Sequence, residues 1–336
     1  MNTARASATE PSVTSLTCRT IELIRGGTHD GPGLRTTVFL KGCSLNCRWC
    51  QNPEGISAQQ EVWWEGRKCI GCGACVEACP SAALSASDEG VRVDRAMCNR
   101  CGACVEACPA RAMTFTGRDW SLEALLKEVL KDRDYYRAFG GGVTVSGGEP
   151  LCQYPFVAEL FRRLQEVGVN TALDTCGLAP AKAFAAVLPH TDHVLFDIKL
   201  LDPALHREFT GCDNEAILAN LLTVADHIRN APSGTKKLWI RTPLIPGATA
   251  TPENLAAIGR FIHEHLLDVT ERWELCAFNS ACSAKFEKLG RAWPYADQPL
   301  LDQRTVAALR EAALSSGIPA SVLVVSGLIA KDQPAG

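Results

Sequence analysis

The sequence has no long hydrophobic run and no apolar leader. Its longest apolar stretch, around residues 321–330, is far shorter than the ~18–20 residues of a membrane span. The first seventeen residues are polar and rich in Ser, Thr and Ala, without the apolar core of a signal peptide. These absences argue against a membrane protein or an exported one. We therefore expect a cytoplasmic protein with a disordered tail at residues 1–17 and no membrane partner.

The sequence also lacks an excess of charge of one sign, because 34 Lys and Arg face 37 Asp and Glu, a formal net charge of -3. A protein that binds nucleic acid mainly through phosphate contacts carries a basic excess. This class is therefore disfavoured, and we expect no nucleic-acid partner. The 336 residues, 46% of them hydrophobic, suffice for roughly two domains of a soluble globular enzyme.

Cysteine is abundant, with 17 residues. A secreted disulfide scaffold would be short and rich in loops. This chain is long and places its cysteines in clusters. In a reducing compartment such clusters indicate metal ligands or redox chemistry.

Eight of the cysteines form two copies of the pattern C-x2-C-x2-C-x3-C-P, 29 residues apart. The first copy holds Cys69, Cys72, Cys75 and Cys79, and the second holds Cys98, Cys101, Cys104 and Cys108. Residues 66–117, which contain both copies, differ in composition from their surroundings. We predict a small domain inserted into a larger one formed by residues 18–65 and 118–330.

The repeat is typical of two-cluster ferredoxins, in which the fourth cysteine of each run binds the other 4Fe–4S cluster. This predicts one cluster on Cys69, Cys72, Cys75 and Cys108, and a second on Cys98, Cys101, Cys104 and Cys79. The alternative is zinc, although zinc sites usually use four ligands in two pairs. With all eight thiolates used, neither cluster has an open iron, so both can carry electrons without binding substrate. A purely structural or docking role is the alternative.

The larger domain alternates strand and helix patterns. Apolar, β-branched runs predict strands at residues 36–41, 142–146, 170–175, 193–199, 238–245, 272–278 and 321–325. Helical patterns separate most of them, at residues 121–139, 155–167, 180–188, 214–228, 252–266 and 302–316. This order favours an α/β fold with a parallel sheet, either a full or partial β/α barrel or a doubly wound open sheet.

A third cysteine motif, Cys43, Cys47 and Cys50, follows the first predicted strand. Three thiolates at this spacing fit around one iron–sulfur cubane and leave one iron open, as a metal site needs for chemistry on a bound ligand. The alternative is a zinc knuckle that takes a distant fourth ligand.

This loop resembles the cluster loop of the radical S-adenosylmethionine superfamily. The flanking residues 29–35 and 49–54 resemble the activating enzymes of glycyl-radical enzymes, such as the pyruvate formate-lyase activase, in the subgroup with a ferredoxin-like insert. The similarity runs from about residue 20 to 319, and some members have His in place of Gln51. The resemblance implies a partial (β/α)6-type TIM-like barrel with an inserted two-cluster ferredoxin-like domain.

The resemblance also implies the reaction. The open iron of a 4Fe–4S cluster chelates S-adenosylmethionine, one electron cleaves the sulfonium, and the 5′-deoxyadenosyl radical removes a Cα hydrogen from a glycine of a partner glycyl-radical enzyme. A flavodoxin or ferredoxin would supply the electron through the two inserted clusters. Besides the three cysteines, the resemblance places Trp49, Gln51 and the segment Gly147, Gly148 and Glu149 at the cofactor, the segment holding its amino group. A plain strand-to-helix turn is the alternative for this segment.

Polar residues at other strand ends complete the predicted site. By resemblance, Asp174, Thr175 and Asp197 hold a monovalent cation beside the cofactor. Lys199 and Arg241 are placed as catalytic residues that meet the methionine carboxylate or ribose, or else they form salt bridges with those aspartates. Asn279 stands where the activase has a histidine; it can contact ribose or carboxylate but cannot titrate. Asp30 precedes the first strand and is a further candidate.

Six cysteines share no spacing, and we expect them to be buried free thiols: Cys18, Cys152, Cys176, Cys212, Cys276 and Cys282. Two other functions are considered. A radical enzyme acting on a small molecule or peptide usually carries its extra clusters after the barrel rather than within its first crossover. A ferredoxin-type electron carrier would leave Cys43–Cys50 and Gly147–Glu149 without a role.

Overall fold

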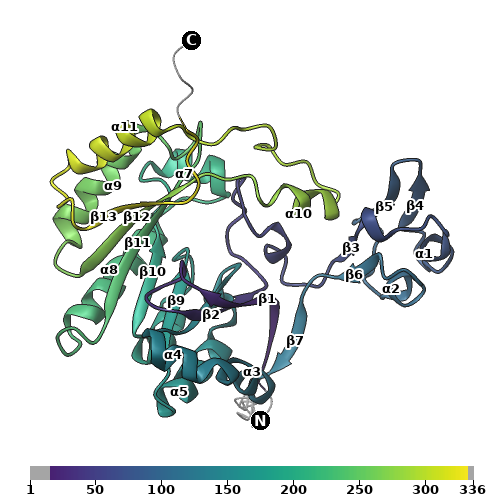
Figure 1. Ribbon diagram of the computed structural model, residues 1–336, viewed down its shortest axis with the longest axis horizontal. Coiled ribbons are helices and arrows are strands. Elements are labelled where there is room, and N and C mark those ends of the chain that lie inside the picture. The colour runs from purple at the N-terminus through teal and green to yellow at the C-terminus, as the bar shows by residue number, and fades with distance from the viewer. Residues whose placement is uncertain (1–15, 332–336) are drawn as a thin grey trace, which may run out of the picture.

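The computed structural model describes residues 16–331, which form a curved β/α body and a smaller unit that projects from it (Figure 1). The predicted tail lies outside the described residues except for Leu16 and Thr17. Thr17 begins a strand and pairs with Ser121, so the sheet starts within the predicted tail. Among the described residues, no helix combines the length and apolar character needed to cross a membrane.

The body is built on a nine-stranded sheet with the order β13-β12-β11-β10-β9-β8-β2-β1-β7. Seven of these strands run parallel and confirm the predicted strands to within a few residues. They are β2 (Arg35–Leu40), β8 (Gly142–Gly147), β9 (Asn170–Thr175), β10 (His193–Asp197), β11 (Lys237–Leu244), β12 (Thr270–Ala277) and β13 (Leu323–Ser326).

Two antiparallel strands, β1 (Thr17–Gly27) and β7 (Arg118–Ser121), extend the sheet beyond β2. They were not predicted from the sequence, because both carry charged residues and lack an apolar run. The sheet order ends at β13 and β7, and within residues 16–331 no hydrogen-bonded ladder joins these two edges. The body is therefore a partial barrel rather than a closed one.

Helices cover the outer side of the curved sheet (Figure 1). The crossovers contain α5 (Tyr154–Glu166), α6 (Ala181–Val187), α7 (Pro203–Thr210), α8 (Glu215–Arg229), α9 (Pro252–His265), α10 (Ser283–Lys288) and α11 (Gln303–Leu314). In α5, the buried residues Phe156, Leu160 and Leu164 recur every four positions and form one apolar face toward the sheet. The predicted helix 121–139 is two helices, α3 (Leu122–Val129) and α4 (Arg133–Phe139), separated by a 3₁₀ turn.

Alternation along the central strands sorts their side chains onto two faces. One set packs with the helices in the main core: Leu173, Phe196 and Ile240. The other set forms a small inner cluster: Ala172, Leu195 and Trp239. Asp174, Asp197 and Arg241 each follow an inner residue by two positions, so they share the inner face at the carboxyl ends of the strands.

The projecting unit contains both cysteine repeats (Figure 1). A short antiparallel pair, β3 (Val62–Trp64) and β6 (Met113–Phe115), forms its stem, and β4 (Leu84–Ser87) pairs with β5 (Gly90–Val93). The repeats fold alike, with α1 (Ala74–Glu77) and α2 (Ala103–Glu106) each following a glycine at positive φ, Gly73 (75°) and Gly102 (85°). The sequence repeat is therefore also a structural repeat.

Candidate active site

A cavity of about 290 Å³ opens at the carboxyl ends of the parallel strands, where β/α folds gather their chemistry. Its walls come from the loop after β2 and from the ends of β8, β9, β10, β11 and β12. The polar and sulfur-bearing lining residues are Asp30, Cys43, Cys47, Cys50, Gln51, Asn52, Ser146, Asp174, Thr175, Cys176, Asp197, Lys199, Arg241 and Cys276. The cavity thus brings together residues that are more than 230 positions apart in the sequence.

The loop with Cys43, Cys47 and Cys50 is fixed by backbone hydrogen bonds to distant segments. The amide of Cys43 donates to Ile56 (3.0 Å), and the amide of Asn46 donates to Thr210 (2.8 Å). All three cysteines line the cavity. Burial raises the pKa of Cys47 to about 12 and also raises that of Cys50, whereas a hydrogen bond with Cys176 lowers the pKa of Cys43. Buried thiols of this kind suit thiolate ligation of a metal cluster, whose positive charge offsets the cost of burial.

Two glycines let the end of β8 pack directly on this loop. A Cβ on Gly148 would lie 2.3 Å from the carbonyl oxygen of Gly42, and one on Gly147 would lie 2.2 Å from that of Leu40. The amides of Gly148 and Glu149 donate to the carbonyls of Leu40 and Gly42. Only glycine fits at this close approach of two backbones.

The carboxylate of Glu149 is fully buried and is held by hydrogen bonds from the protein. It accepts hydrogen bonds from the Thr175 hydroxyl (2.8 Å) and from the amides of Leu151 (3.0 Å) and Cys176 (2.8 Å). Burial raises its pKa above the usual range. The side chain lies behind Thr175, which lines the cavity, and is itself not among the lining residues.

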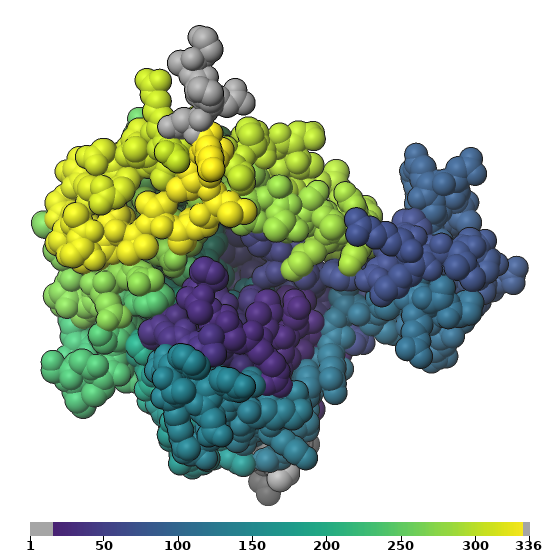
Figure 2. Space-filling view, in the orientation of Figure 1, coloured from purple at the N-terminus to yellow at the C-terminus, as the bar shows by residue number. Residues whose placement is uncertain are grey.

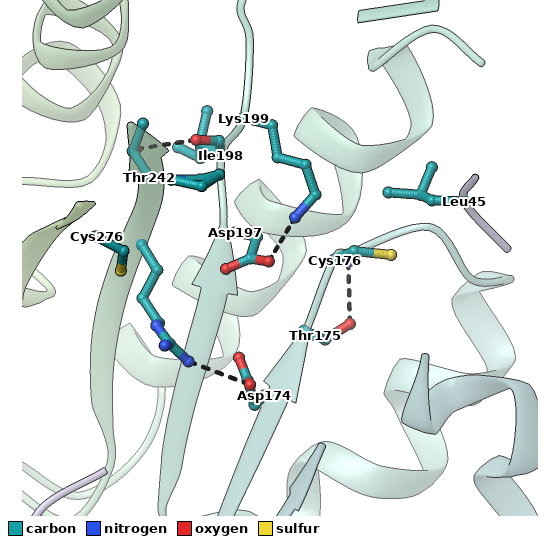
Figure 3. A network of polar contacts seen from close by, with 12 residues as sticks. Leu45, Asp174, Thr175, Cys176, Asp197, Ile198, Lys199, Thr242 and Cys276 are labelled. Atoms are coloured by element: carbon teal, nitrogen blue, oxygen red, sulfur yellow. Dashed lines mark hydrogen bonds and ion pairs between the residues drawn. The ribbon is translucent and has the colours of Figure 1, made fainter. Parts of the chain in front are cut away.

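Four charged side chains lie close together at the strand ends, and Figure 3 labels three of them, Asp174, Asp197 and Lys199. Lys199 Nζ lies 2.5 Å from Asp197, and Arg241 Nη1 lies 3.2 Å from Asp174. Burial raises the pKa of Asp174 to about 6, although Arg241 acts in the opposite direction. Burial lowers the pKa of Lys199, but Asp197 and nearby thiols outweigh it and leave this pKa above its ordinary value. Lys199 and Arg241 thus each form a salt bridge with one of these aspartates while also lining the cavity.

The other predicted residues lie in and around the cavity. Trp49 and Gln51 line it, and Asp30 lies at its edge, where it accepts a hydrogen bond from Thr37 (2.9 Å). The Gln51 amide donates to the backbone carbonyl of Asn279 (3.2 Å). The side chain of Asn279 accepts from the Ala281 amide and is not among the lining residues.

Besides Asn52 and four apolar residues, the lining residues that were not predicted as site residues are Ser146, Cys176 and Cys276. Ser146 donates to Asp174 (2.7 Å), and Cys176 lies beside the cluster loop, 3.9 Å from the Ser44 hydroxyl. These three residues lie at the ends of strands, and Ser146 and Cys176 directly adjoin predicted residues. This position was the available signal. All six cysteines expected to be buried free thiols are free, but only three of them are buried: Cys18, Cys176 and Cys282. Cys212 and Cys276 are partly buried, and Cys152 is exposed.

The projecting unit contains two hollows, each lined by four cysteines. The first is lined by Cys69, Cys72, Cys75 and Cys108, and the second by Cys79, Cys98, Cys101 and Cys104. These are the two crossed sets expected for two clusters. Within residues 16–331, no three His, Cys, Asp or Glu side chains converge as they would around a single ion. In a cubane each thiolate binds a different iron, so such convergence is not required.

Comparisons with known proteins agree with this combination of partial barrel and cysteine loop. The family model of the radical SAM superfamily matches residues 37–257, from within β2 to within α9. The chain is 37% identical to the isethionate sulfite-lyase activating enzyme of Desulfovibrio desulfuricans, over 81% of this chain and 86% of that protein. It is 39% identical to the (2S)-3-sulfopropanediol dehydratase activating enzyme of Klebsiella oxytoca, over 78% and 82% of the two chains.

A third relative, the choline trimethylamine-lyase activating enzyme of Oleidesulfovibrio alaskensis, is 33% identical over 88% of this chain and 94% of that protein. The chain therefore belongs to the radical SAM superfamily and, within it, to the activating enzymes of glycyl-radical enzymes. Enzymes of this family cleave S-adenosylmethionine at a 4Fe–4S cluster and generate a glycyl radical on a partner enzyme.

Proposed function

We propose that this chain binds S-adenosylmethionine in the cavity beside Cys43, Cys47 and Cys50 and uses it to activate a glycyl-radical enzyme. The observation that carries the proposal is that three thiols with the family spacing share one cavity with Lys199 and Arg241. These three thiols would hold a 4Fe–4S cluster, which would supply one electron to the sulfonium, so that methionine would leave and the 5′-deoxyadenosyl radical would take one hydrogen atom from a glycine Cα.

The protein's own residues bind and orient the cosubstrate. The cations Lys199 and Arg241 suit the methionine carboxylate or the ribose hydroxyls. Gly147 and Gly148 let backbone approach the amino group closely, and Glu149 fixes Thr175 from behind. Trp49 and Gln51 line the same wall, and Asn279 supports Gln51 through its backbone carbonyl.

The proposal also includes a monovalent cation held by Asp174, Thr175 and Asp197, which all line the cavity. Both carboxylates already have a cationic neighbour, Arg241 or Lys199, so an added cation would compete with these pairs. Binding of S-adenosylmethionine measured in potassium and in tetramethylammonium buffer tests this part. Equal affinity in both buffers would contradict a cation site.

The projecting unit is proposed to be a ferredoxin-like domain with two 4Fe–4S clusters that relay electrons to the cluster loop. Two observations support a relay: the two hollows each collect four cysteines, and one cysteine of each set, Cys72 or Cys101, is exposed. A reduced flavodoxin or ferredoxin is the proposed donor, which agrees with a cytoplasmic location.

The proposal is tested by anaerobic reconstitution followed by chemical reduction. Three clusters predict ~12 irons per chain, since each cubane holds four. Dithionite with S-adenosylmethionine should then release 5′-deoxyadenosine and methionine, and EPR should detect a glycyl radical on the partner glycyl-radical enzyme. Cys50→Ala should abolish cleavage, whereas the exposed Cys152→Ala serves as the matched control. Cleavage that survives Cys50→Ala would contradict the proposal.

A further inference from the structure

The segment 285–291, at the end of α10 and just after it, spans from the barrel to the base of the projecting unit (Figure 1). In the space-filling view its yellow-green atoms meet the blue atoms of that unit (Figure 2). We propose that this segment, called here the bracket, fixes the projecting unit relative to the cluster loop and so positions it for electron transfer. The inference rests on the proposed relay.

One end of the bracket holds the cluster loop. Lys285 Nζ lies 2.7 Å from a carboxylate oxygen of Glu54 and 2.7 Å from the side-chain oxygen of Asn52. Glu54 follows Cys50 by four residues and is only 1% exposed. A carboxylate buried to this degree needs a cationic partner, so Lys285 ties the bracket to the loop with the three thiols.

The other end holds the stem of the projecting unit. Lys288 Nζ lies 3.2 Å from Glu65 and 5.0 Å from the ring centre of Trp63. Arg291 Nη2 lies 2.8 Å from Glu61, which is 6% exposed and directly precedes β3. The projecting unit also donates to the bracket, through a hydrogen bond from Arg95 to the backbone carbonyl of Leu289 (2.8 Å).

Aromatic packing anchors the bracket itself. Phe286 stacks on Trp293 with ring centres 5.6 Å apart, and Trp293 stacks on Phe278 at the end of β12 (5.9 Å). The same apolar cluster includes Trp49 of the cluster loop. The bracket is therefore packed against both the end of β12 and the cluster loop.

The stem needs such support, because β3 and β6 are three residues long and an isolated two-stranded pair is marginal in water. Without the bracket, the unit would sample other orientations, and electron transfer falls steeply as the separation of two clusters grows. Lys288 and Arg291 are thus positioning residues. They act on the distance between the clusters and touch no substrate.

The test is the double variant K288A/R291A in the reconstituted enzyme. We expect ~12 irons per chain, cleavage driven by dithionite within about twofold of the unmodified enzyme, and flavodoxin-driven cleavage lowered about fivefold or more. Amide exchange in β3 and β6 should be faster, and Arg291→Lys should restore part of the flavodoxin-driven rate. The control R162A/R163A removes two partly exposed ion-pair cations from α5 and should change neither rate.

An unchanged flavodoxin-driven rate together with unchanged exchange in β3 and β6 would overturn the inference. So would an equal fall of both rates with loss of iron, because that indicates a general folding defect. Failure of the proposed function looks different: the unmodified enzyme itself would then release no 5′-deoxyadenosine with dithionite.

Discussion

Arg241 Nη1 lies 3.2 Å from Asp174 Oδ2, and this contact joins β11 to β9 across the end of β10. The same guanidinium lies 3.8 Å from Asp30 and 3.7 Å from Glu274, which is buried. One cation therefore balances three carboxylates at the inner face. Its removal leaves buried negative charge without compensation.

The first prediction concerns this cation. Arg241→Met should lower the free energy of unfolding by about 3–5 kcal/mol, the usual cost of an unpaired buried charge. Adding Asp174→Asn should recover part of the loss, because the nearest carboxylate is then neutral. Anaerobic urea denaturation measures both, with Arg162→Met on the exposed face of α5 as control. Equal loss in Arg241→Met and the control would refute the charge argument.

The second prediction concerns the close packing of β8 on the cluster loop. Gly148→Ala places a Cβ 2.3 Å from the carbonyl oxygen of Gly42, so the loop must move. We expect loss of the cluster held by Cys43, Cys47 and Cys50, with the iron content falling from ~12 to ~8 per chain. Gly27→Ala is the matched control, since its Cβ meets no atom nearer than 3.8 Å. Full iron content in Gly148→Ala would show that the loop tolerates the shift.

The sequence predicted the sheet because apolar, β-branched runs are a local signal. It also predicted that Asp174, Asp197 and Arg241 meet, since parallel strands bring their carboxyl ends to one edge. It did not predict β1, whose partners β2 and β7 are chosen by distant backbone pairing. The sequence did not predict the break in helix 121–139 for a similar reason. Asp132 and Glu128 beside this break bind Arg25, a contact that forms only in the folded chain.

Within the site, residue types were predicted better than their contacts. Cysteine spacing is a local pattern, and the two hollows collect the expected sets. The hydrogen bonds of Glu149 with Thr175 and Cys176 depend on how two strand ends pack, which no spacing encodes. The contacts of Lys285 with Glu54 join segments more than 230 residues apart. Such contacts depend on the complete fold and cannot be predicted from local sequence patterns.

The third prediction is a pH dependence of stability that originates away from the site. Burial, together with nearby Arg35, lowers the pKa of His193 to about 4. Its Nδ1 is buried without a hydrogen-bond partner. The other charged groups around it are Asp192, Lys237 and Glu271. The histidine is therefore neutral in the folded protein at pH values where an unfolded chain would protonate it.

The sign follows from proton binding. Between the ordinary pKa near 6.5 and the folded value near 4, the unfolded state binds a proton that the folded state does not, so stability falls as the pH is lowered. Below about pH 4 this contribution is constant. His193→Gln should reduce this fall in stability by on the order of 2 kcal/mol. Identical urea midpoints for unmodified enzyme and His193→Gln from pH 7 to 4.5 would contradict this.

The fourth prediction separates a relay from a structural role for the projecting unit. Cys101 is exposed and belongs to the second set of four cysteines. If the unit is a relay, Cys101→Ala should lower the flavodoxin-driven rate at least about tenfold more than the dithionite-driven rate. Dithionite is small enough to reduce the cluster on Cys43, Cys47 and Cys50 directly, whereas a protein donor is not. The two rates are measured as 5′-deoxyadenosine released per minute.

The matched control is Cys152→Ala, which removes an exposed thiol outside both sets. It should leave the ratio of the two rates unchanged. If Cys101→Ala also leaves this ratio unchanged while iron falls by about four per chain, the second cluster lies on no electron path and its role is structural. If the ratio falls only in Cys101→Ala, the electrons from the protein donor pass through the projecting unit before they reach the loop of Cys43, Cys47 and Cys50.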